Sequence, residues 1–168
     1  AWACYFKNKP CISLSHQAAV LSPGLPLPEH TDMLGKLILN TYAPGSAKYG
    51  FHFSSYNDTI FTPVIRKQVR QAEVTDAGHY TVYLPSYDDK RLIGFLSEFK
   101  DVKWDVFSKH NRRPFRSGNI NIQPINSEKY TASMAASSGI LCGAGFEIPA
   151  EALYLGKKLI VVPMRNQY

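Results

Sequence analysis

The segment 142–152 reads CGAGFEIPAEA and places two glycines and two glutamates close together. Gly143 and Gly145 follow an apolar run and stand directly before a helical pattern. A helix that begins there turns free backbone N–H groups and the positive end of its dipole towards a ligand. Because neither glycine has a side chain, phosphate oxygens can approach the backbone closely. The spacing predicts an anion site suited to a diphosphate, and a simple packing turn is the alternative.

Glu147 and Glu151 lie four residues apart, which puts them on one face of that helix. A carboxylate in the first turn favours the helix dipole, and this explanation suits Glu147. Glu151 stands one turn further in, where the dipole effect is weaker. A carboxylate beside a phosphate site can accept hydrogen bonds from both hydroxyls of a ribose. We therefore expect Glu151 to be a ribose ligand, with stabilisation of the helix as the alternative.

His16 follows a short strand pattern at residues 11–15. An imidazole titrates near neutral pH, which suits proton transfer. A histidine bonded to the backbone at a strand end is the structural alternative. The five histidines and three cysteines show no spacing typical of a metal site. We therefore expect no metal ion and no cofactor.

The chain carries a formal net charge of +6, and its densest basic cluster has no acidic residue in it. Such a cluster is either a solvated loop or a contact for an anionic ligand or lipid surface. It consists of Lys109, His110, Arg112, Arg113 and Arg116. No zinc-finger spacing, aromatic RNA-binding strand or helix-turn-helix pattern accompanies it, so we expect no nucleic-acid partner.

From residue 79 onward, short apolar strands alternate with helical patterns. Strands are expected at residues 80–84, 102–107, 120–125, 139–142 and 159–162, and helices at 88–99, 127–137 and 147–155. This alternation predicts an α/β fold, a Rossmann-like parallel sheet with helices on both faces. Ser127 is the expected N-cap of the second helix. Ligands bind outside the carboxyl ends of such strands, where the 143–147 loop lies.

The first 62 residues give one strand, a helix at about 29–41 and one or two strands within 47–62. These elements cannot enclose a core of their own. We expect residues 1–62 to be the tail of a preceding domain, 63–78 to be a linker, and 79–168 to be the α/β domain, truncated at its C-terminus. Apolar surface left uncovered on residues 1–62 predicts self-association.

Residues 143–168 resemble the donor-binding signature of GT-B glycosyltransferases, and most closely an uncharacterised bacterial branch of the MurG-like group (glycosyltransferase family 28). The resemblance rests on Gly143–Glu151, the segment 153–163 and Asn166-Gln167-Tyr168. It implies the C-terminal half of a GT-B fold that binds a UDP-sugar. The residues implied to bind the nucleotide-sugar are Gly143, Ala144, Gly145, Phe146, Glu147, Glu151 and, in the sugar loop, Gln167.

A weaker resemblance extends upstream. Pro63–Arg66 is similar to the interdomain crossing, where Arg66 would lie near the phosphates. Leu84–Tyr87 stands at the family's Gly- and Ser-rich loop but has no glycine, so only Ser86 is implied as a ligand. His16 would lie on the acceptor side of the cleft, as the catalytic residue. The chain ends before the Glu-Gln that completes the sugar loop, so we expect this fragment to be inactive.

The resemblance implies transfer of a sugar from a UDP-sugar to an acceptor hydroxyl of unknown identity, by inverting displacement. The alternatives are a UDP-sugar 2-epimerase of GT-B architecture and a non-catalytic nucleotide-binding module. Three scattered cysteines favour reduced thiols in the cytoplasm. No apolar run approaches the length of a membrane helix. We therefore expect a cytoplasmic protein, with peripheral contact to the inner face of the membrane as its only membrane association.

Overall fold

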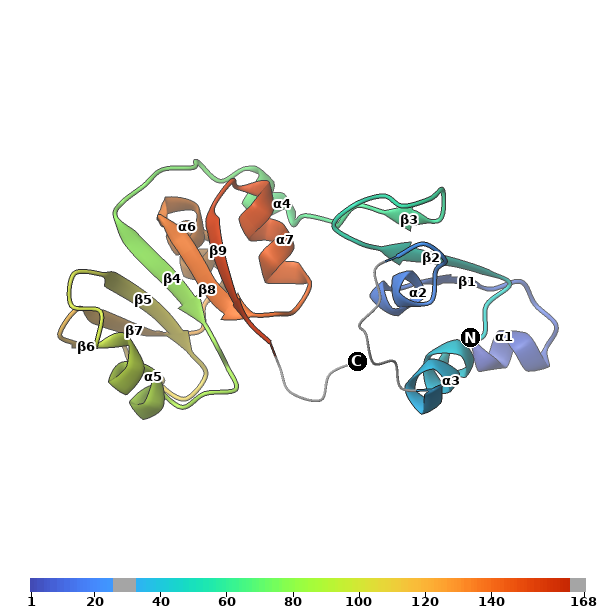
Figure 1. The fold of residues 1–168 in the computed structure, drawn as a ribbon, viewed down its shortest axis with the longest axis horizontal. Helices are drawn as coiled ribbons and strands as arrows, with labels where there is room; N and C mark the ends of the chain where they lie inside the picture. The colour runs from blue at the N-terminus through green and yellow to red at the C-terminus, as the bar shows by residue number, and fades with distance from the viewer. Residues whose placement is uncertain (26–32, 164–168) are drawn as a thin grey trace. The chain divides into compact units, whose positions relative to one another are not determined.

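The computed structural model describes residues 1–25 and 33–163. These residues form two compact units, one made of Ala1–Val64 and one that begins at Ile65 (Figure 1). The second unit contains the 143–147 loop and most of the residues expected to bind a ligand. Each unit is described by itself below.

A six-stranded sheet with the order β6-β7-β5-β4-β8-β9 forms the centre of the second unit. All neighbouring strands are parallel except β6 and β7, which pair antiparallel. The strands are β4 (His79–Tyr83), β5 (Lys103–Ser108), β6 (Phe115–Ser117), β7 (Ile120–Pro124), β8 (Gly139–Gly143) and β9 (Lys158–Val162). The chain order reverses beside β4, because β5 lies on one side of β4 and β8 on the other.

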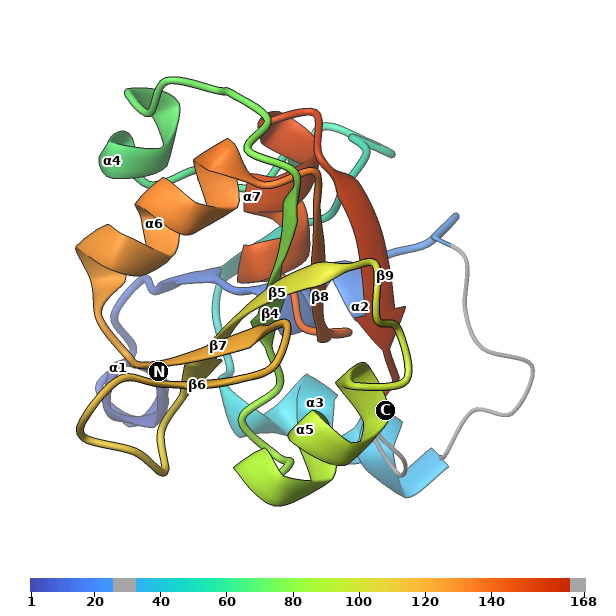
Figure 2. The ribbon, with the colours of Figure 1, turned by 90° about the vertical axis from the view of Figure 1, so that its left-hand side faces the viewer.

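Helices cover both faces of this sheet. In Figure 2, α5 (Asp89–Leu96) lies on one face, and α4 (Lys67–Arg70), α6 (Ser127–Ala136) and α7 (Glu147–Tyr154) lie on the other. The side chains of successive strand residues point to opposite faces. Accordingly Val106 packs in the core under α5, whereas Phe107 packs in the core under α6 and α7. The expected Rossmann-like α/β fold with helices on both faces is confirmed.

A polar network under α6 fixes this helix over the sheet. The Ser133 hydroxyl on α6 lies 2.8 Å from the hydroxyl of Thr81 on β4 and donates to the Asp105 carboxylate on β5 at 3.1 Å. Asn121 on β7 donates to the same carboxylate at 2.7 Å. Buried polar groups need such partners, because a lone one costs about 1 to 3 kcal/mol. The network therefore sets the position of α6, whose N-terminus lies at the carboxyl edge.

Two local features differ from the expected ones. The N-cap of α6 is Asn126, whose side chain accepts a hydrogen bond from the backbone N–H of Lys129, so the expectation for Ser127 was wrong. The edge strand Phe115–Ser117 was not expected, because three residues with one arginine among them show no strand periodicity. It adds the one antiparallel pair to the sheet.

Residues 65–78, expected in a linker, belong to the second unit. Val69 on α4 is fully buried in the core that α6 and α7 also cover. Lys157 ties the end of this segment to α6, because its ammonium donates to the backbone oxygens of Thr75 at 2.6 Å and Ser137 at 2.7 Å. Burial lowers the pKa of Lys157. This packing places Arg66, just before α4, beside the sheet.

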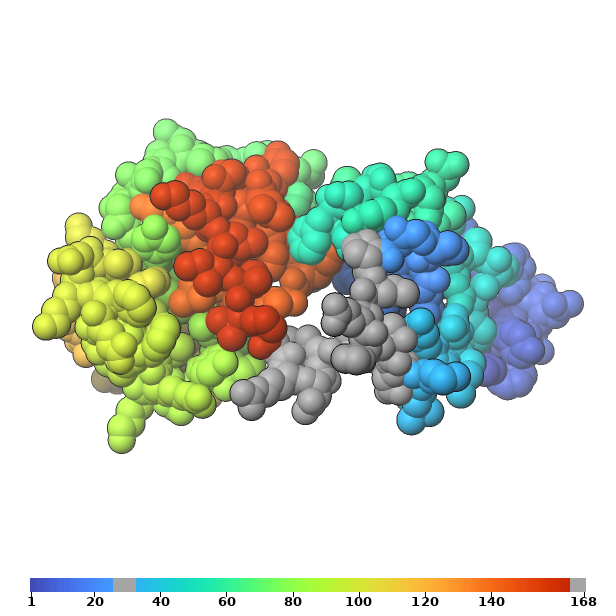
Figure 3. Space-filling view, viewed as in Figure 1, coloured from blue at the N-terminus to red at the C-terminus, as the bar shows by residue number. Residues whose placement is uncertain are grey.

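The first unit is smaller and has little core. It contains a parallel sheet with the order β1-β2-β3 and a buried cluster of Ala19, Leu25 and Ile60. Its elements are α1 (Trp2–Phe6), β1 (Ile12–Leu14), α2 (His16–Val20), α3 (Met33–Tyr42), β2 (Ala47–Phe51) and β3 (Ile60–Phe61). Figure 3 shows α1 and α3 at the surface of this unit. No described residue of α3 is buried.

Candidate functional site

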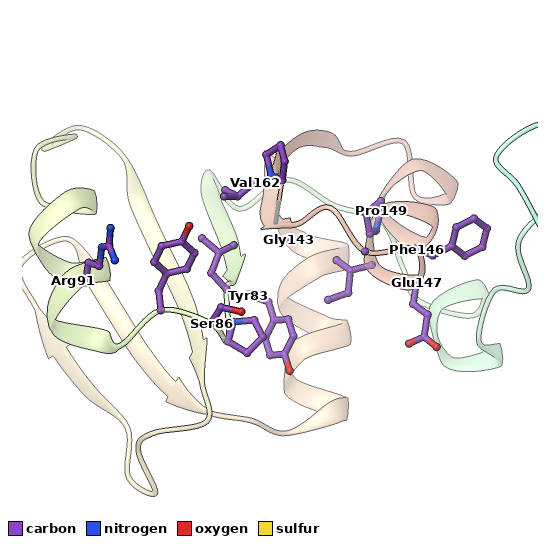
Figure 4. A pocket seen from close by; sticks show the side chains of 14 residues that line it. Tyr83, Ser86, Arg91, Gly143, Phe146, Glu147, Pro149 and Val162 are labelled. Carbon is purple, nitrogen blue, oxygen red and sulfur yellow. The ribbon is translucent and has the colours of Figure 1, made fainter. Parts of the chain in front are cut away.

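A cavity of about 870 Å³ opens at the carboxyl edge of the second unit's sheet. One wall comes from the end of β4 and the start of α5, and the other from the loop between β8 and α7 (Figure 4). The two walls belong to neighbouring strands at which the chain order reverses. Open parallel sheets bind ligands at such a switch point.

The glycine loop forms one wall without any conformational need for glycine. Gly143 and Gly145 both line the cavity, and neither has a positive φ. A Cβ atom built on either residue would meet no heavy atom within 4 Å. The space beside the two glycines is therefore open, and a ligand can approach their backbone closely.

The N-terminus of α7 faces the same cavity. Phe146 occupies the N-cap position and makes no side-chain cap bond, and Glu147 and Ile148 of the first turn line the cavity. The Ala144 N–H is used elsewhere, because it donates to the Val162 oxygen at 3.0 Å. The first backbone N–H groups of a helix have no partner within the helix. They supply donors and a positive field for an anion.

The opposite wall carries aromatic and cationic side chains. Tyr83, Ser86 and Tyr87 extend from the end of β4, and Arg91 comes from α5. The Arg91 guanidinium lies 5.3 Å from the centre of the Tyr87 ring, a cation–π distance. Figure 4 shows Ser86 and Arg91 on this side and Gly143 on the other. The cavity thus pairs helix N–H donors with a permanent positive charge.

A smaller cavity of about 260 Å³ shares Tyr83, Glu147 and Ile148 with the larger one. It contains a bidentate ion pair in which Arg66 Nε donates to one carboxylate oxygen of Glu151 at 2.6 Å and a second guanidinium N–H donates to the other at 2.7 Å. The remaining guanidinium nitrogen donates to the Ser127 hydroxyl at 3.2 Å.

The ion pair has one buried and one exposed partner. The Glu151 side chain is 3% exposed, whereas that of Arg66 is 44% exposed. The hydrogen bond to Glu151 raises the pKa of Arg66, which stays charged. The expected role of Glu151 as a ribose ligand requires an accessible carboxylate, whereas this carboxylate is buried beneath Arg66.

Tyr130 on α6 also lines the smaller cavity and is 7% exposed. Its hydroxyl has no hydrogen-bond partner among the described residues. Burial raises the pKa of Tyr130, so the phenol keeps its proton. An unpartnered buried hydroxyl costs free energy that a polar ligand group can recover.

Most of the expected residues come together in the second unit. Ser86, Gly143, Gly145, Phe146 and Glu147 line the larger cavity, and Arg66, Glu147 and Glu151 line the smaller one. Ala144 is exposed in the loop between β8 and α7. His16 lies in the first unit, where it begins α2 and its ring lies 5.6 Å from that of Phe51. Gln167 lies outside the described residues.

Sequence reasoning missed Tyr83, Arg91 and Tyr130. Arg91 could have been found, because it stands in the first turn of the helix that follows β4, as Glu147 does after β8. Tyr130 carried no signal, since an aromatic residue within a helical pattern is usually part of a core.

The described residues contain neither a metal-binding cluster nor a membrane-spanning helix. Within residues 1–25 and 33–163, no three His, Cys, Asp or Glu side chains are grouped closely enough to hold a metal ion. No helix in the described part of the chain is long and apolar enough to cross a membrane.

One family of known proteins matches this chain. The model of the family described as "Glycosyl transferase family 1" matches residues 3–168. Among solved structures, the glycosyltransferase SnogD from Streptomyces nogalater is similar to this chain, with 14% sequence identity and a TM-score of 0.42. The match covers 74% of this chain and 34% of that one, so this chain spans about a third of SnogD. No curated protein matches.

Proposed function

This chain belongs to glycosyl transferase family 1, and from that membership and the two neighbouring cavities we propose that its second unit binds a nucleoside diphosphate sugar. The sugar is then transferred to an acceptor hydroxyl. The observation that carries the proposal is the open space beside Gly143 and Gly145 at the N-terminus of α7.

The diphosphate belongs in the larger cavity. Its oxygens would accept hydrogen bonds from the first N–H groups of α7 and lie against backbone that has no side chain. Arg91 on the opposite wall supplies a charge that hydrogen-bonds to phosphate. Each hydrogen bond to a charged group contributes about 1.5 to 3 kcal/mol. The Ser86 hydroxyl adds a neutral donor on the same side.

The nucleoside belongs beside the smaller cavity, with Glu151 as the ribose ligand. An ionised carboxylate has about four acceptor positions, and the bidentate arginine uses one on each oxygen. The other lone pairs can accept from the two ribose hydroxyls once the smaller cavity opens around the carboxylate, because the Glu151 side chain is 3% exposed in this structure. Arg66 then acts as a positioning residue, because its two bonds fix the plane of the carboxylate. The Tyr130 hydroxyl offers a further donor to the nucleoside.

We further propose a UDP-sugar as the donor and inverting displacement as the mechanism. The support for both is the resemblance of residues 143–168 to the donor-binding signature. In a direct displacement the acceptor oxygen bonds to the anomeric carbon, the bond to the diphosphate breaks, and a base takes the hydroxyl proton. We assign that base to His16, whose imidazole is exposed at the start of α2.

Calorimetric titration with UDP tests the proposal. Gly145→Val should weaken UDP binding by about ten- to a hundredfold, the loss of one hydrogen bond to a charged group. The fold should persist, because the added side chain meets no protein atom near its Cβ. Gly94→Val is the matched control, since Gly94 lies on α5 with equally open space and lines neither cavity.

Three outcomes decide the matter. Loss of affinity in Gly145→Val alone, with unchanged melting, supports the diphosphate site. If Gly145→Val binds UDP as tightly as Gly94→Val does, the diphosphate site is refuted and the glycines form only a packing turn. If the wild-type protein binds GDP or dTDP but not UDP, the diphosphate site is supported and the assignment of a uridine nucleotide is overturned.

A further inference from the structure

The loop between β5 and β6 carries the most concentrated charge in the chain. Between Asp105 and Glu128 the sequence has no acidic residue, and it contains four permanent cations. They are Lys109, Arg112, Arg113 and Arg116, and all four are exposed. Arg116 donates to the Gly118 backbone oxygen at 3.0 Å. The other three have no ion-pair partner among the residues that the structure describes.

This loop lies at the same edge of the sheet as the two cavities. Ser108 ends the parallel strand β5, and Phe115 begins β6 opposite Ile122, near the end of β7. The residues between these two strands therefore project from the carboxyl edge. Asn111 fixes the loop to the rest of the unit, because its amide donates to the carboxylate of Asp89 on α5.

An aromatic side chain stands among the cations. Phe115 is 40% exposed and is separated from Arg113 by one proline and followed by Arg116. Exposed arginines beside an exposed apolar ring suit the interface of a bilayer, where the ring enters the headgroup region and the cations meet anionic lipids. A strand of nucleic acid would instead require cations along a groove and several rings for base stacking.

We propose that the loop Lys109–Arg116 is a docking surface for an anionic lipid membrane. Binding there would hold the carboxyl edge, with its cavities, at the membrane surface. The interaction is electrostatic and reversible, because each cation near an anionic bilayer contributes about fivefold to the partition constant. It is independent of which sugar donor the site takes.

Sedimentation with phosphatidylcholine vesicles, with and without phosphatidylserine, tests the proposal. The wild-type protein should sediment only with the vesicles that contain phosphatidylserine, and less at high salt. The variant K109Q/R112Q/R113Q should lose about a hundredfold in partitioning, at about fivefold for each charge. The variant K67Q/R70Q/K100Q removes the same charge from exposed positions outside the loop, so it should bind nearly as the wild type does.

The control separates a local surface from net charge. Equal losses in the two triple variants would overturn the proposal, because the net charge alone would then explain binding. Equal sedimentation with both kinds of vesicle would overturn it as well. So would binding of a single-stranded oligonucleotide, in the absence of any vesicle binding, that the loop variant abolishes. An unchanged melting transition in both triple variants confirms that the fold is intact.

Discussion

At the scale of single residues, the Arg66–Glu151 pair is asymmetric in burial, and this predicts unequal effects of removing each partner. Arg66→Gln leaves a buried carboxylate with no cation, whereas Glu151→Gln leaves an arginine that water can still solvate. We expect Arg66→Gln to lower the free energy of unfolding by about 1 to 3 kcal/mol and Glu151→Gln to lower it by less. Urea denaturation of both variants measures which of the two loses more free energy of unfolding.

The double variant gives the matching control. With both charges removed, the loss should be smaller than the sum of the two single losses, because the orphaned carboxylate is absent. Additive losses, or a larger loss for Glu151→Gln, would contradict the pairing. UDP affinity should fall in Glu151→Gln if this carboxylate is the ribose ligand.

The three cysteines should differ in reactivity. Cys142 on β8 is fully buried, and burial raises the pKa of its thiol to about 11. Cys4 and Cys11 are partly exposed. The thiolate is the reactive form, so iodoacetamide should modify Cys4 and Cys11 in the folded protein at pH 8 and leave Cys142 unmodified. Peptide mass spectrometry checks this, and labelling in urea should include all three.

Residue types and local spacing predicted the part of the site that one segment supplies. Gly143, Gly145 and Glu147 stand at a strand–helix junction, and the structure places all three on the cavity. The contact of Arg66 with Glu151 joins residues 85 positions apart. No local pattern encodes such a contact, because it depends on how α4 and α7 pack on the sheet.

At the scale of elements, strong periodicity located the helices and strands of the second unit. The continuous apolar runs at residues 139–142 and 159–162 became β8 and β9. β8 is buried, as a central parallel strand should be, whereas β9 stands at the edge of the sheet and exposes Ile160 and Val161. Short elements without periodicity were missed, and α2 is an example. Its five residues form a helix because Ser15 caps it by accepting from the Ala18 N–H.

The cap of α6 can be tested directly. Asn126→Ala should lower the free energy of unfolding by about 1 kcal/mol, because the Lys129 N–H loses its acceptor. Ser127→Ala is the neighbouring control, since the Ser127 hydroxyl accepts from Arg66 and caps nothing. Ser127→Ala should lower the free energy of unfolding by less than Asn126→Ala does. A larger loss in Ser127→Ala, measured by thermal denaturation, would restore Ser127 as the cap.

At the scale of the whole molecule, the two units differ in how well their apolar residues are covered. The second unit has two buried clusters, one on each face of its sheet. The first unit has a cluster of three residues, while several of its large apolar side chains are more than half exposed. They include Tyr5, Phe6, Ile12, Met33, Leu37 and Ile38. Such a surface favours association with another apolar surface.

We therefore predict that the protein self-associates through α3 of the first unit. Leu37 and Ile38 are adjacent and 59% and 53% exposed, and burying a side chain of this size contributes about 1.5 to 3 kcal/mol. Leu37→Lys/Ile38→Lys should convert a concentration-dependent oligomer into a monomer, as measured by light scattering over a dilution series. Leu153→Lys/Tyr154→Lys alters an equally exposed pair on α7 and should leave the oligomer intact. A wild-type monomer at every concentration would refute the prediction, and equal dissociation in both variants would place the contact elsewhere.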